Sequence, residues 1–146
     1  MRLTKLEKAY LAGLFDGEGT VGYYHKTKLG YHIVQVAIYN SDPTIMAWIQ
    51  DRISFGSIVS NKVSKHRGWA WMVSSKTQAK QFLKVIRPYL VIKAEQVDLL
   101  LSFLDAEQKN RGVGSGKKLS KDELATRVET EIQLKRLKTA NFQSIH

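Results

Sequence analysis

A glycine-rich segment near the N-terminus, Leu11–Gly19, constrains the fold of this chain more than any other part of its sequence. It follows Thr4–Glu7, which has the form of a capping box, with a hydroxyl at the helix N-cap and a carboxylate three residues later. A helix is therefore predicted to begin at Thr4 and to run into the segment. The glycines at the end of the segment stop the helix and leave two carboxylates, Asp16 and Glu18, close to its C-terminus.

One face of this predicted helix has almost no side chains. Ala9, Gly13 and Gly17 are four residues apart, so they lie above one another and allow another backbone to approach closely. Two glycines inside one helix cost about 1 kcal/mol each relative to alanine. Close contact with a second helix would offset this cost, and the face is therefore predicted to be a helix–helix interface.

The predicted helix also ends in a concentration of negative charge. The last carbonyl groups of a helix carry partial negative charge, and Asp16 and Glu18 add full charges at the same end. Oxygen ligands with a focused negative potential suit a hard divalent cation such as Mg²⁺. On charge alone, a glycine-rich helix end with two solvated acids is the more common arrangement.

The composition indicates a polyanionic partner. The 146 residues include 23 Lys and Arg against 13 Asp and Glu, a net charge of +10, which favours nucleic acid over an anionic membrane. No apolar run is long enough to span a membrane and no signal peptide is recognisable, so we expect an intracellular protein, cytoplasmic or organellar, without a membrane partner. The absence of cysteine excludes disulfides, zinc–thiolate sites and a cysteine nucleophile, and the four histidines lack metal-ligand spacing. No small-molecule cofactor is expected.

Hydrophobic periodicity and turn residues predict one α+β domain over residues 1–146. Strands are predicted at residues 20–26, 31–39, 58–62 and 69–74, and further helices at residues 43 to about 55, 78–87, 94–108 and 120–139. This order is typical of four antiparallel strands with helices packed on one face. Residues from about 117 to 146 are expected to form a C-terminal helical extension.

Alternation in the second predicted strand assigns its two faces. The apolar set that suits the core is Val34, Val36 and Ile38. The intervening set that suits a half-exposed face is Ile33, Gln35 and Ala37. Trp48, Trp69 and Trp71 are expected in the core rather than as platforms for base stacking, because the last two share the parity of Val73.

The segment Leu11–Gly19 resembles the signature of the LAGLIDADG homing endonucleases. The residues that match it letter for letter are Leu11, Ala12, Gly13, Leu14, Asp16 and Gly19. At the other three positions the residue is of the same kind as in the signature: Phe15 is apolar, Gly17 is small and Glu18 is a carboxylate. The resemblance covers roughly residues 4–108. It implies the fold of that family, in which the motif helix precedes a saddle-shaped sheet of four antiparallel strands.

The resemblance also implies a metal-dependent nuclease. In the family, the final carboxylate of the motif binds a divalent cation with help from the preceding carbonyl group. This assigns the metal to Glu18 and to the backbone oxygen of Gly17, with Mg²⁺ or another divalent cation such as Mn²⁺ as cofactor. The implied reaction is hydrolysis of a phosphodiester bond.

Further catalytic residues follow from the same resemblance. The segment Arg87–Gln96 is similar to the family pattern Pro-x-Leu-x-x-Lys-x-x-Gln, in which the lysine reaches the active site. Lys93 is therefore expected to activate the nucleophilic water or to stabilise charge on the phosphate, and Gln96 to support it. A polar residue at the end of the second strand positions water in the family, and Asn40 occupies that place.

A single motif implies a homodimer. One carboxylate can serve one DNA strand, so a double-strand break requires two copies of the chain, and a twofold dimer reads a near-palindromic site. The residues expected at the dimer interface are Ala9, Gly13, Asp16 and Gly17. Asp16 is expected to brace the turn at that interface.

The polar face of the strands is predicted to bind double-stranded DNA. An antiparallel sheet can enter the major groove, where base pairs present distinct donors and acceptors. The candidates are Tyr24, Lys26, Lys28, Tyr31, Gln35, Asn61, Lys65 and Arg67, with Ile33 and Ala37 placed to meet thymine methyl groups. A solvated sheet face is the alternative, which any α+β protein would offer.

Two other functions fit parts of the sequence. One is a nucleic-acid-binding protein that does not cleave, such as an intron maturase or a transcription regulator on the same fold. The other is a basic structural or ribosome-associated protein in which Leu11–Gly19 is only a packing helix. The presence of both Glu18 and Lys93 favours the nuclease.

Overall fold

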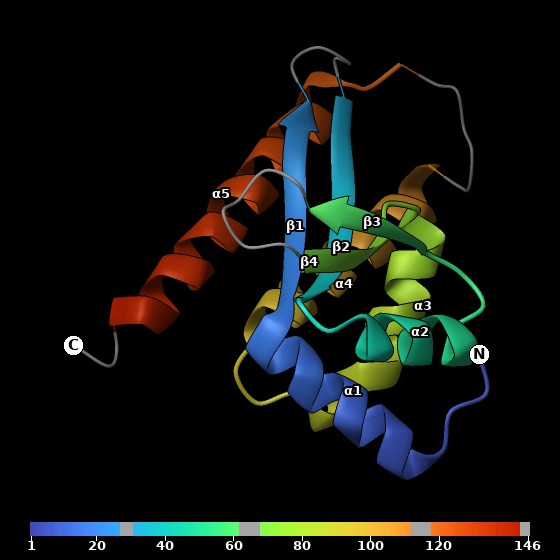
Figure 1. The fold of residues 1–146 in the computed structure, drawn as a ribbon. Helices are drawn as coiled ribbons and strands as arrows, with labels where there is room; N and C mark the ends of the chain where they lie inside the picture. The colour runs from blue at the N-terminus through green and yellow to red at the C-terminus, as the bar shows by residue number, and fades with distance from the viewer. Residues whose placement is uncertain (27–30, 62–67, 112–117, 144–146) are drawn as a thin grey trace.

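The chain follows the predicted order of helices and strands. The computed structural model describes residues 1–26, 31–61, 68–111 and 118–143, and the predicted turn at 28–30 lies outside them. The elements are α1 (Lys5–Glu18), β1 (Gly19–Lys26), β2 (Tyr31–Asn40), α2 (Pro43–Arg52), β3 (Ser57–Asn61), β4 (Gly68–Val73), α3 (Lys76–Ile86), the 3-10 turn η1 (Arg87–Tyr89), α4 (Ala94–Arg111) and α5 (Lys121–Gln143). Figure 1 shows the sheet in front of α3 and α4, α1 below it, and α5 along the β1 side.

Reciprocal side-chain caps begin the first and last helices. The Thr4 N–H donates to Glu7 Oε2 at 2.8 Å, and the Glu7 N–H donates to Thr4 Oγ1 at 3.2 Å. Ser120 and Glu123 form the same pair of bonds, at 2.7 and 3.1 Å, at the start of α5. The capping box predicted at Thr4 is confirmed, and Ser120 begins α5 in the same way, so local sequence is sufficient to begin these two helices.

The strands form one antiparallel sheet in the order β1-β2-β4-β3. The register of β1 and β2 places Val21 opposite Val36 and Tyr24 opposite Ile33. The inner face, which carries Val21 and Val36, packs against the helices, and the outer face carries Tyr24 and Ile33. This arrangement confirms the predicted α+β fold with an antiparallel sheet of four strands.

The core lies between the inner face of the sheet and the helices. The predicted core residues of β2, all fully buried, are Val34, Val36 and Ile38. Trp71 of β4 lies 4.9 Å from Phe82 of α3 between ring centroids, and Phe82 lies 5.8 Å from Phe15 of α1. These ring contacts join the motif helix to the sheet through α3, which fixes α1 in place.

Burial differs from the prediction at a few positions of the sheet and of α2. Ala37 was predicted to be half-exposed but is fully buried, because this small side chain lies in a central strand between Thr20 and Met72. Trp48 and Trp69 were expected in the core but are only partly buried and pack against its margin. Alternation therefore predicts the direction of a side chain better than its burial.

Helix boundaries differ from the prediction by a few residues. α3 begins at Lys76 rather than residue 78, because the Ser75 hydroxyl accepts a bond from the Gln78 N–H at 3.4 Å. α2 ends at Arg52 rather than near residue 55, because the next residue, Ile53, adopts an extended backbone and is buried. α4 and α5 both extend past their predicted ends. Within the described ranges, no helix is long and apolar enough to cross a membrane.

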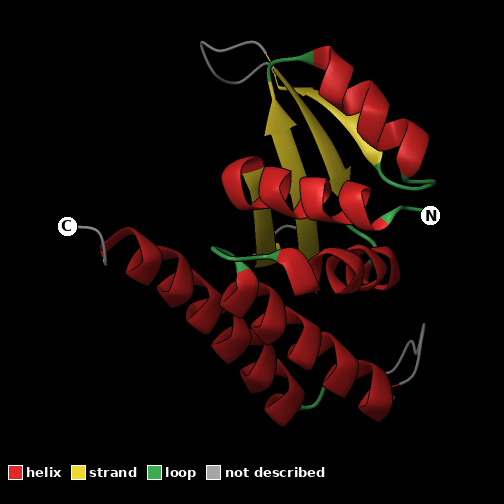
Figure 2. Cartoon of the chain, turned by 90° about the horizontal axis from the view of Figure 1, so that it is seen from below, coloured by secondary structure: helices red, strands yellow, loops and turns green. Residues whose placement is uncertain are grey.

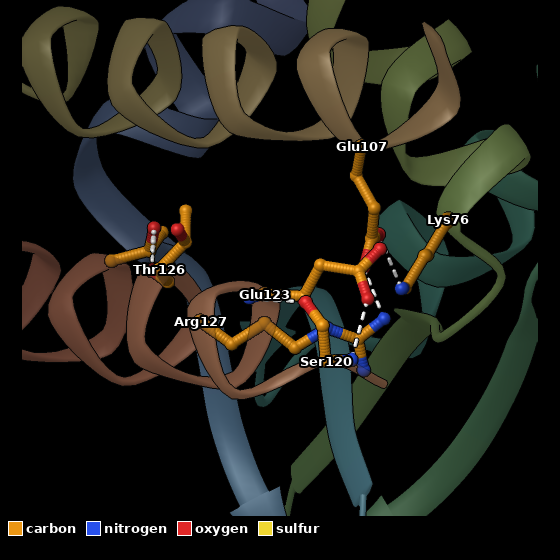
Figure 3. A network of polar contacts seen from close by, with 7 residues as sticks. Lys76, Glu107, Ser120, Glu123, Thr126 and Arg127 are labelled. Carbon is orange, nitrogen blue, oxygen red and sulfur yellow. Dashed lines mark hydrogen bonds and ion pairs between the residues drawn. The ribbon is translucent and has the colours of Figure 1, made fainter. Parts of the chain in front are cut away.

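Charged side chains hold α5 against the rest of the domain (Figure 3). Glu107 of α4 accepts hydrogen bonds from Lys76 of α3, at 2.5 Å, and from Arg127 of α5. The carboxylate of Glu131 accepts from the backbone N–H of His25 at 3.2 Å. α5 therefore runs along the free edge of β1 and beside α4, as the turned view also shows (Figure 2). The predicted C-terminal helical extension is thus docked on the domain.

A buried histidine lies beside this edge. His32 of β2 is 3% exposed, and its ring stacks on Tyr23 with 4.9 Å between the centroids. Burial lowers the pKa of His32, and the charges of His25 and Arg127 lower it further. The charge of Glu131, whose Oε2 lies 3.2 Å from His32 Nε2, opposes this shift without reversing it. The folded protein therefore binds a proton at His32 less readily than the unfolded chain does.

The free energy of unfolding is expected to decrease when the pH is lowered, because of His32. Above the ordinary pKa of about 6.5, the ring is neutral in both states and stability is complete. As pH falls through that value, the unfolded chain takes up a proton that the folded chain resists, so the free energy of unfolding decreases. Urea unfolding at about pH 7.5 and pH 5.5 measures the loss, which His32→Phe should reduce. His25→Phe should leave most of the loss in place, because burial is the largest cause of the lowered pKa of His32. Equal pH dependence in the protein and its His32→Phe variant would refute this account.

Candidate functional site

The C-terminus of α1 presents an exposed carboxylate at the edge of the sheet. Glu18 is the last residue of α1, and Gly19 begins β1 without an intervening loop. A Cβ atom at Gly19 would lie 2.3 Å from the ring of Phe15, so only glycine allows the chain to pass from helix to strand this tightly. The motif glycine therefore places Glu18 where the helix axis and the sheet meet.

Asp16 joins the motif helix to the turn before α4. Its Oδ2 accepts from the Val91 N–H at 2.8 Å, and its Oδ1 accepts from the Lys93 N–H at 2.9 Å. Both oxygens of the carboxylate are thus used within the chain, on the side of α1 that faces this turn. Asp16 thus braces the turn that carries Lys93, and its expected place at a dimer interface stays a prediction.

Lys93 lies beside the end of α1. Its ammonium group donates to the backbone oxygen of Asp16. Burial lowers the pKa of Lys93, and the negative charges of Asp16 and Glu18 oppose that shift. The structure therefore brings together Glu18 and Lys93, two residues that are 75 positions apart in the chain, at one end of α1.

The other two candidate catalytic residues occupy less exposed positions. Asn40 ends β2, two residues beyond Ile38, which lies opposite Gly19, so it is close in register to the end of α1. Its side-chain oxygen accepts from the Asp42 N–H at 2.8 Å and helps to turn the chain into α2. Gln96, in the first turn of α4, is 4% exposed. Its side chain lies below the surface, where it can act only through its neighbours.

The small-residue face of α1 is open in the isolated chain. Ala9, Gly13 and Gly17 are exposed, and a Cβ atom added at either glycine would have no heavy atom within 4 Å. Two apolar side chains in the N-terminal half of α1 are also exposed, Leu6 at 82% and Tyr10 at 54%. The surface formed by these five residues, termed the α1 surface below, is therefore free to pack against another molecule.

Oxygen atoms are the donors available for a metal near Glu18. In the described part of the chain, no group of three or more His, Cys, Asp or Glu side chains converges as a preformed metal site. One chain offers the exposed carboxylate of Glu18 and the neighbouring carbonyl groups at the negative end of α1. These are ligands for a hard cation, but one chain supplies too few of them to enclose it.

The candidate DNA-binding residues of the first hairpin share the outer face of the sheet. Tyr24 lies opposite Ile33, Lys26 opposite Tyr31, and Gln35 opposite Gly22. Lys26 and Tyr31 are exposed, Tyr24, Ile33 and Gln35 are half-buried, and Ala37 is buried. In β3, Asn61 pairs with Gly68. Lys28, Lys65 and Arg67 lie outside the described residues.

A residue that the sequence did not single out also approaches this region. Lys138, near the end of α5, places its ammonium nitrogen 5.7 Å from the centre of the Tyr24 ring. Burial is the largest cause that lowers the pKa of Lys138, and the positive charges of Lys93 and Lys135 lower it further. No local pattern around Lys138 marks it, because its position depends on how α5 docks along β1.

Solved structures of homing endonucleases have the same fold as this chain. The archaeal intron-encoded homing endonuclease I-Vdi141I, complexed with DNA, is matched over 90% of this chain and 84% of its own, with a TM-score of 0.74 and 14% identity. I-CvuI, in complex with its target in the presence of calcium, is matched over 90% of this chain and 82% of its own, with a TM-score of 0.70 and 19% identity.

A longer homing endonuclease of the same fold matches this chain over less than half of its own length. The LAGLIDADG homing endonuclease I-LtrWI, bound to target DNA, is matched over 90% of this chain but 45% of its own, with a TM-score of 0.67 and 19% identity. No family model matches the chain, and no curated protein matches it either. The structural likeness confirms the fold that the motif predicted. The chain has the fold of the LAGLIDADG homing endonucleases, and its α1 carries the sequence signature of that family.

Proposed function

We propose that this chain is a site-specific homing endonuclease that acts as a homodimer. It makes a double-strand break in a long, near-palindromic DNA target by metal-dependent hydrolysis of phosphodiester bonds. The observation that carries the proposal is the meeting of Glu18 and Lys93 at the end of the motif helix, held there by the bonds of Asp16 to the turn before α4.

Glu18 and the carbonyl oxygen of Gly17 are the residues that would hold a divalent cation. They fit Mg²⁺ or Mn²⁺ because both donors are oxygen atoms at the negative end of α1 and because the Glu18 side chain is exposed. When bound, such a cation polarises the phosphate and lowers the pKa of a water molecule. I-CvuI has been crystallised with DNA in the presence of calcium and of magnesium, and in the magnesium complex the DNA is not cleaved.

The remaining site residues act on the phosphate and on the attacking water. The ammonium group of Lys93 stabilises negative charge that develops on the phosphate during in-line displacement. Its bond to the Asp16 carbonyl oxygen aims it at the end of α1 before DNA binds. Asn40 orients the water, and Gln96, buried in the first turn of α4, supports Lys93.

The homodimer brings two such sites together. The chain has one motif and therefore one Glu18, whereas two strands must be cut. The α1 surface, with its exposed glycines and apolar side chains, provides a place where two copies of α1 can pack closely. The match to this chain covers 45% of the length of I-LtrWI. This is about the share expected if one longer chain replaces a pair of shorter chains. Each copy supplies one carboxylate at the shared axis.

The outer face of the sheet lies against the major groove in this proposal. A net charge of +10 attracts the phosphate backbone, and Lys26, Tyr31 and Gln35 face the bases from one face of the same hairpin. Because binding releases counterions, DNA affinity falls steeply with salt concentration. I-Vdi141I and I-LtrWI, which have this fold, are both described on DNA.

The test is cleavage of a plasmid library that contains randomised sites. The protein is incubated with the library and Mg²⁺, and the ends of linear products are sequenced. The proposal expects cuts at one long, near-palindromic site, with staggered breaks that leave short 3′ overhangs. DNA binding without any cleavage in Mg²⁺ or Mn²⁺ would overturn the nuclease function and leave a non-cleaving DNA-binding protein on this fold.

A further inference from the structure

We propose that Lys138 binds a DNA phosphate next to the cleaved bond, so that α5 completes the active site of each subunit. This inference rests on the proposed nuclease function, because it names one more contact to the same substrate. It assigns a binding role to a helix that lies beyond the part of the chain covered by the motif resemblance.

The position of Lys138 is fixed through Tyr24. A Cβ atom at Gly22 would lie 2.2 Å from the Tyr24 ring, so the outer end of this ring lies over Gly22, on the side of Tyr24 from which β1 comes from Glu18. The ammonium nitrogen of Lys138 lies 5.7 Å from the centre of that ring, a distance at which a cation is attracted to an aromatic ring. Lys138 is therefore held on the active-site side of the outer face.

The charge around Lys138 is unbalanced. Burial and then the charges of Lys93 and Lys135 lower its pKa, so the ammonium groups of Lys93 and Lys138 repel one another. Lys135 forms an ion pair with Glu131 at 2.8 Å. Among the residues that the structure describes, no carboxylate lies within ion-pair distance of Lys138. Folding thus places Lys138 within the electrostatic influence of Lys93 without an acid of its own to pair with.

The hydrogen bonds and ion pairs that dock α5 do not involve Lys138. The helix is held by the bonds of Arg127 to Glu107 and of Glu131 to the His25 N–H. The approach of Lys138 to Lys93 is therefore imposed by the rest of the domain, at a cost in free energy. A phosphate group between the two ammonium groups would remove that cost, and DNA is the polyanion that the net charge of +10 already favours.

The first test measures binding and does not require cleavage. The affinity for a non-specific DNA duplex is measured over a range of salt concentrations for the unchanged protein and for Lys138→Gln. The slope of log affinity against log salt should become less steep by about 0.9 for each subunit that loses the contact. Arg136→Gln, a loss of equal charge from an exposed position of α5, should leave the slope unchanged, and Lys138→Arg should restore it.

The second test locates the contact. Single phosphates of the cleaved site are replaced by neutral methylphosphonates, and the affinity of each duplex is measured with both proteins. The phosphate whose neutralisation weakens binding of the unchanged protein, but not of Lys138→Gln, should adjoin the cleaved bond. The same variant should cut at least about tenfold more slowly with saturating protein.

The outcomes separate this inference from the proposed function. If the protein binds DNA and Lys138→Gln shows the slope change without any cleavage by the unchanged protein, phosphate binding stands and the nuclease function fails. If the unchanged protein cuts DNA and Lys138→Gln matches it in slope and rate, the inference alone is wrong. A contact located far from the cleaved bond, or no DNA binding at all, also overturns it.

Discussion

Replacing Glu18 with glutamine is expected to reduce DNA cleavage by about 10³-fold or more, a loss of roughly 4 kcal/mol of transition-state stabilisation. The change keeps the size of the side chain and removes the negative charge that would hold the cation. DNA affinity should change little, because phosphate contacts from lysine and arginine dominate it. Single-turnover cleavage and equilibrium binding on the same target duplex measure the two effects separately.

A matched variant shows whether the site of the change matters. Glu129 is an exposed glutamate on α5, far along the chain from the motif, and Glu129→Gln removes the same charge. It should cut DNA at the rate of the unchanged protein. Retained cleavage by Glu18→Gln would show that Glu18 is not the metal ligand, whatever the behaviour of the control.

Gly13→Leu is expected to convert the proposed dimer into a folded monomer. A Cβ atom added at this position meets nothing within 4 Å in one chain, and leucine favours a helix over glycine by about 1 kcal/mol. The single subunit should therefore remain folded or gain stability. In the dimer, the added side chain would separate the two copies of α1 at the point where their backbones approach. Light scattering should report half the mass, and double-strand cleavage should be lost.

The control for Gly13→Leu is a leucine added to an exposed position of another helix. Ala125 of α5 is exposed, and Ala125→Leu should leave both the mass and the cleavage unchanged. Circular dichroism and urea unfolding of both variants show that the subunits are folded. If Gly13→Leu keeps the mass of the unchanged protein, the two copies do not pack through the α1 surface.

Local sequence determines more of this fold than of its site. The capping boxes at Thr4 and Ser120 each lie within four residues, so the starts of α1 and α5 could be predicted. Alternation along β2 gave the correct faces because it depends on backbone geometry alone. The burial of Ala37 was missed because it depends on the neighbouring strands, whose register is set by the whole sheet.

The candidate site depends on contacts between distant segments. Resemblance to a family pattern singled out Lys93, but nothing in the sequence indicated that the carboxylate of Asp16 would bind the N–H groups of Val91 and Lys93, some 75 residues later. The path of α5 along β1 rests on a bond between Glu131 and His25, which are 106 positions apart. The proximity of Lys138 to the site follows from that path and so could not be predicted.

The central claim is that one Glu18 from each of two subunits cuts one strand of DNA. The measurement that tests it most directly uses a mixed dimer of one unchanged subunit and one Glu18→Gln subunit, carrying different affinity tags and purified through both. With a supercoiled plasmid that contains the target site, the mixed dimer should produce nicked circles and almost no linear DNA. Linear DNA formed at the rate of the unchanged dimer, or a plasmid left intact by the mixed dimer, would contradict the claim.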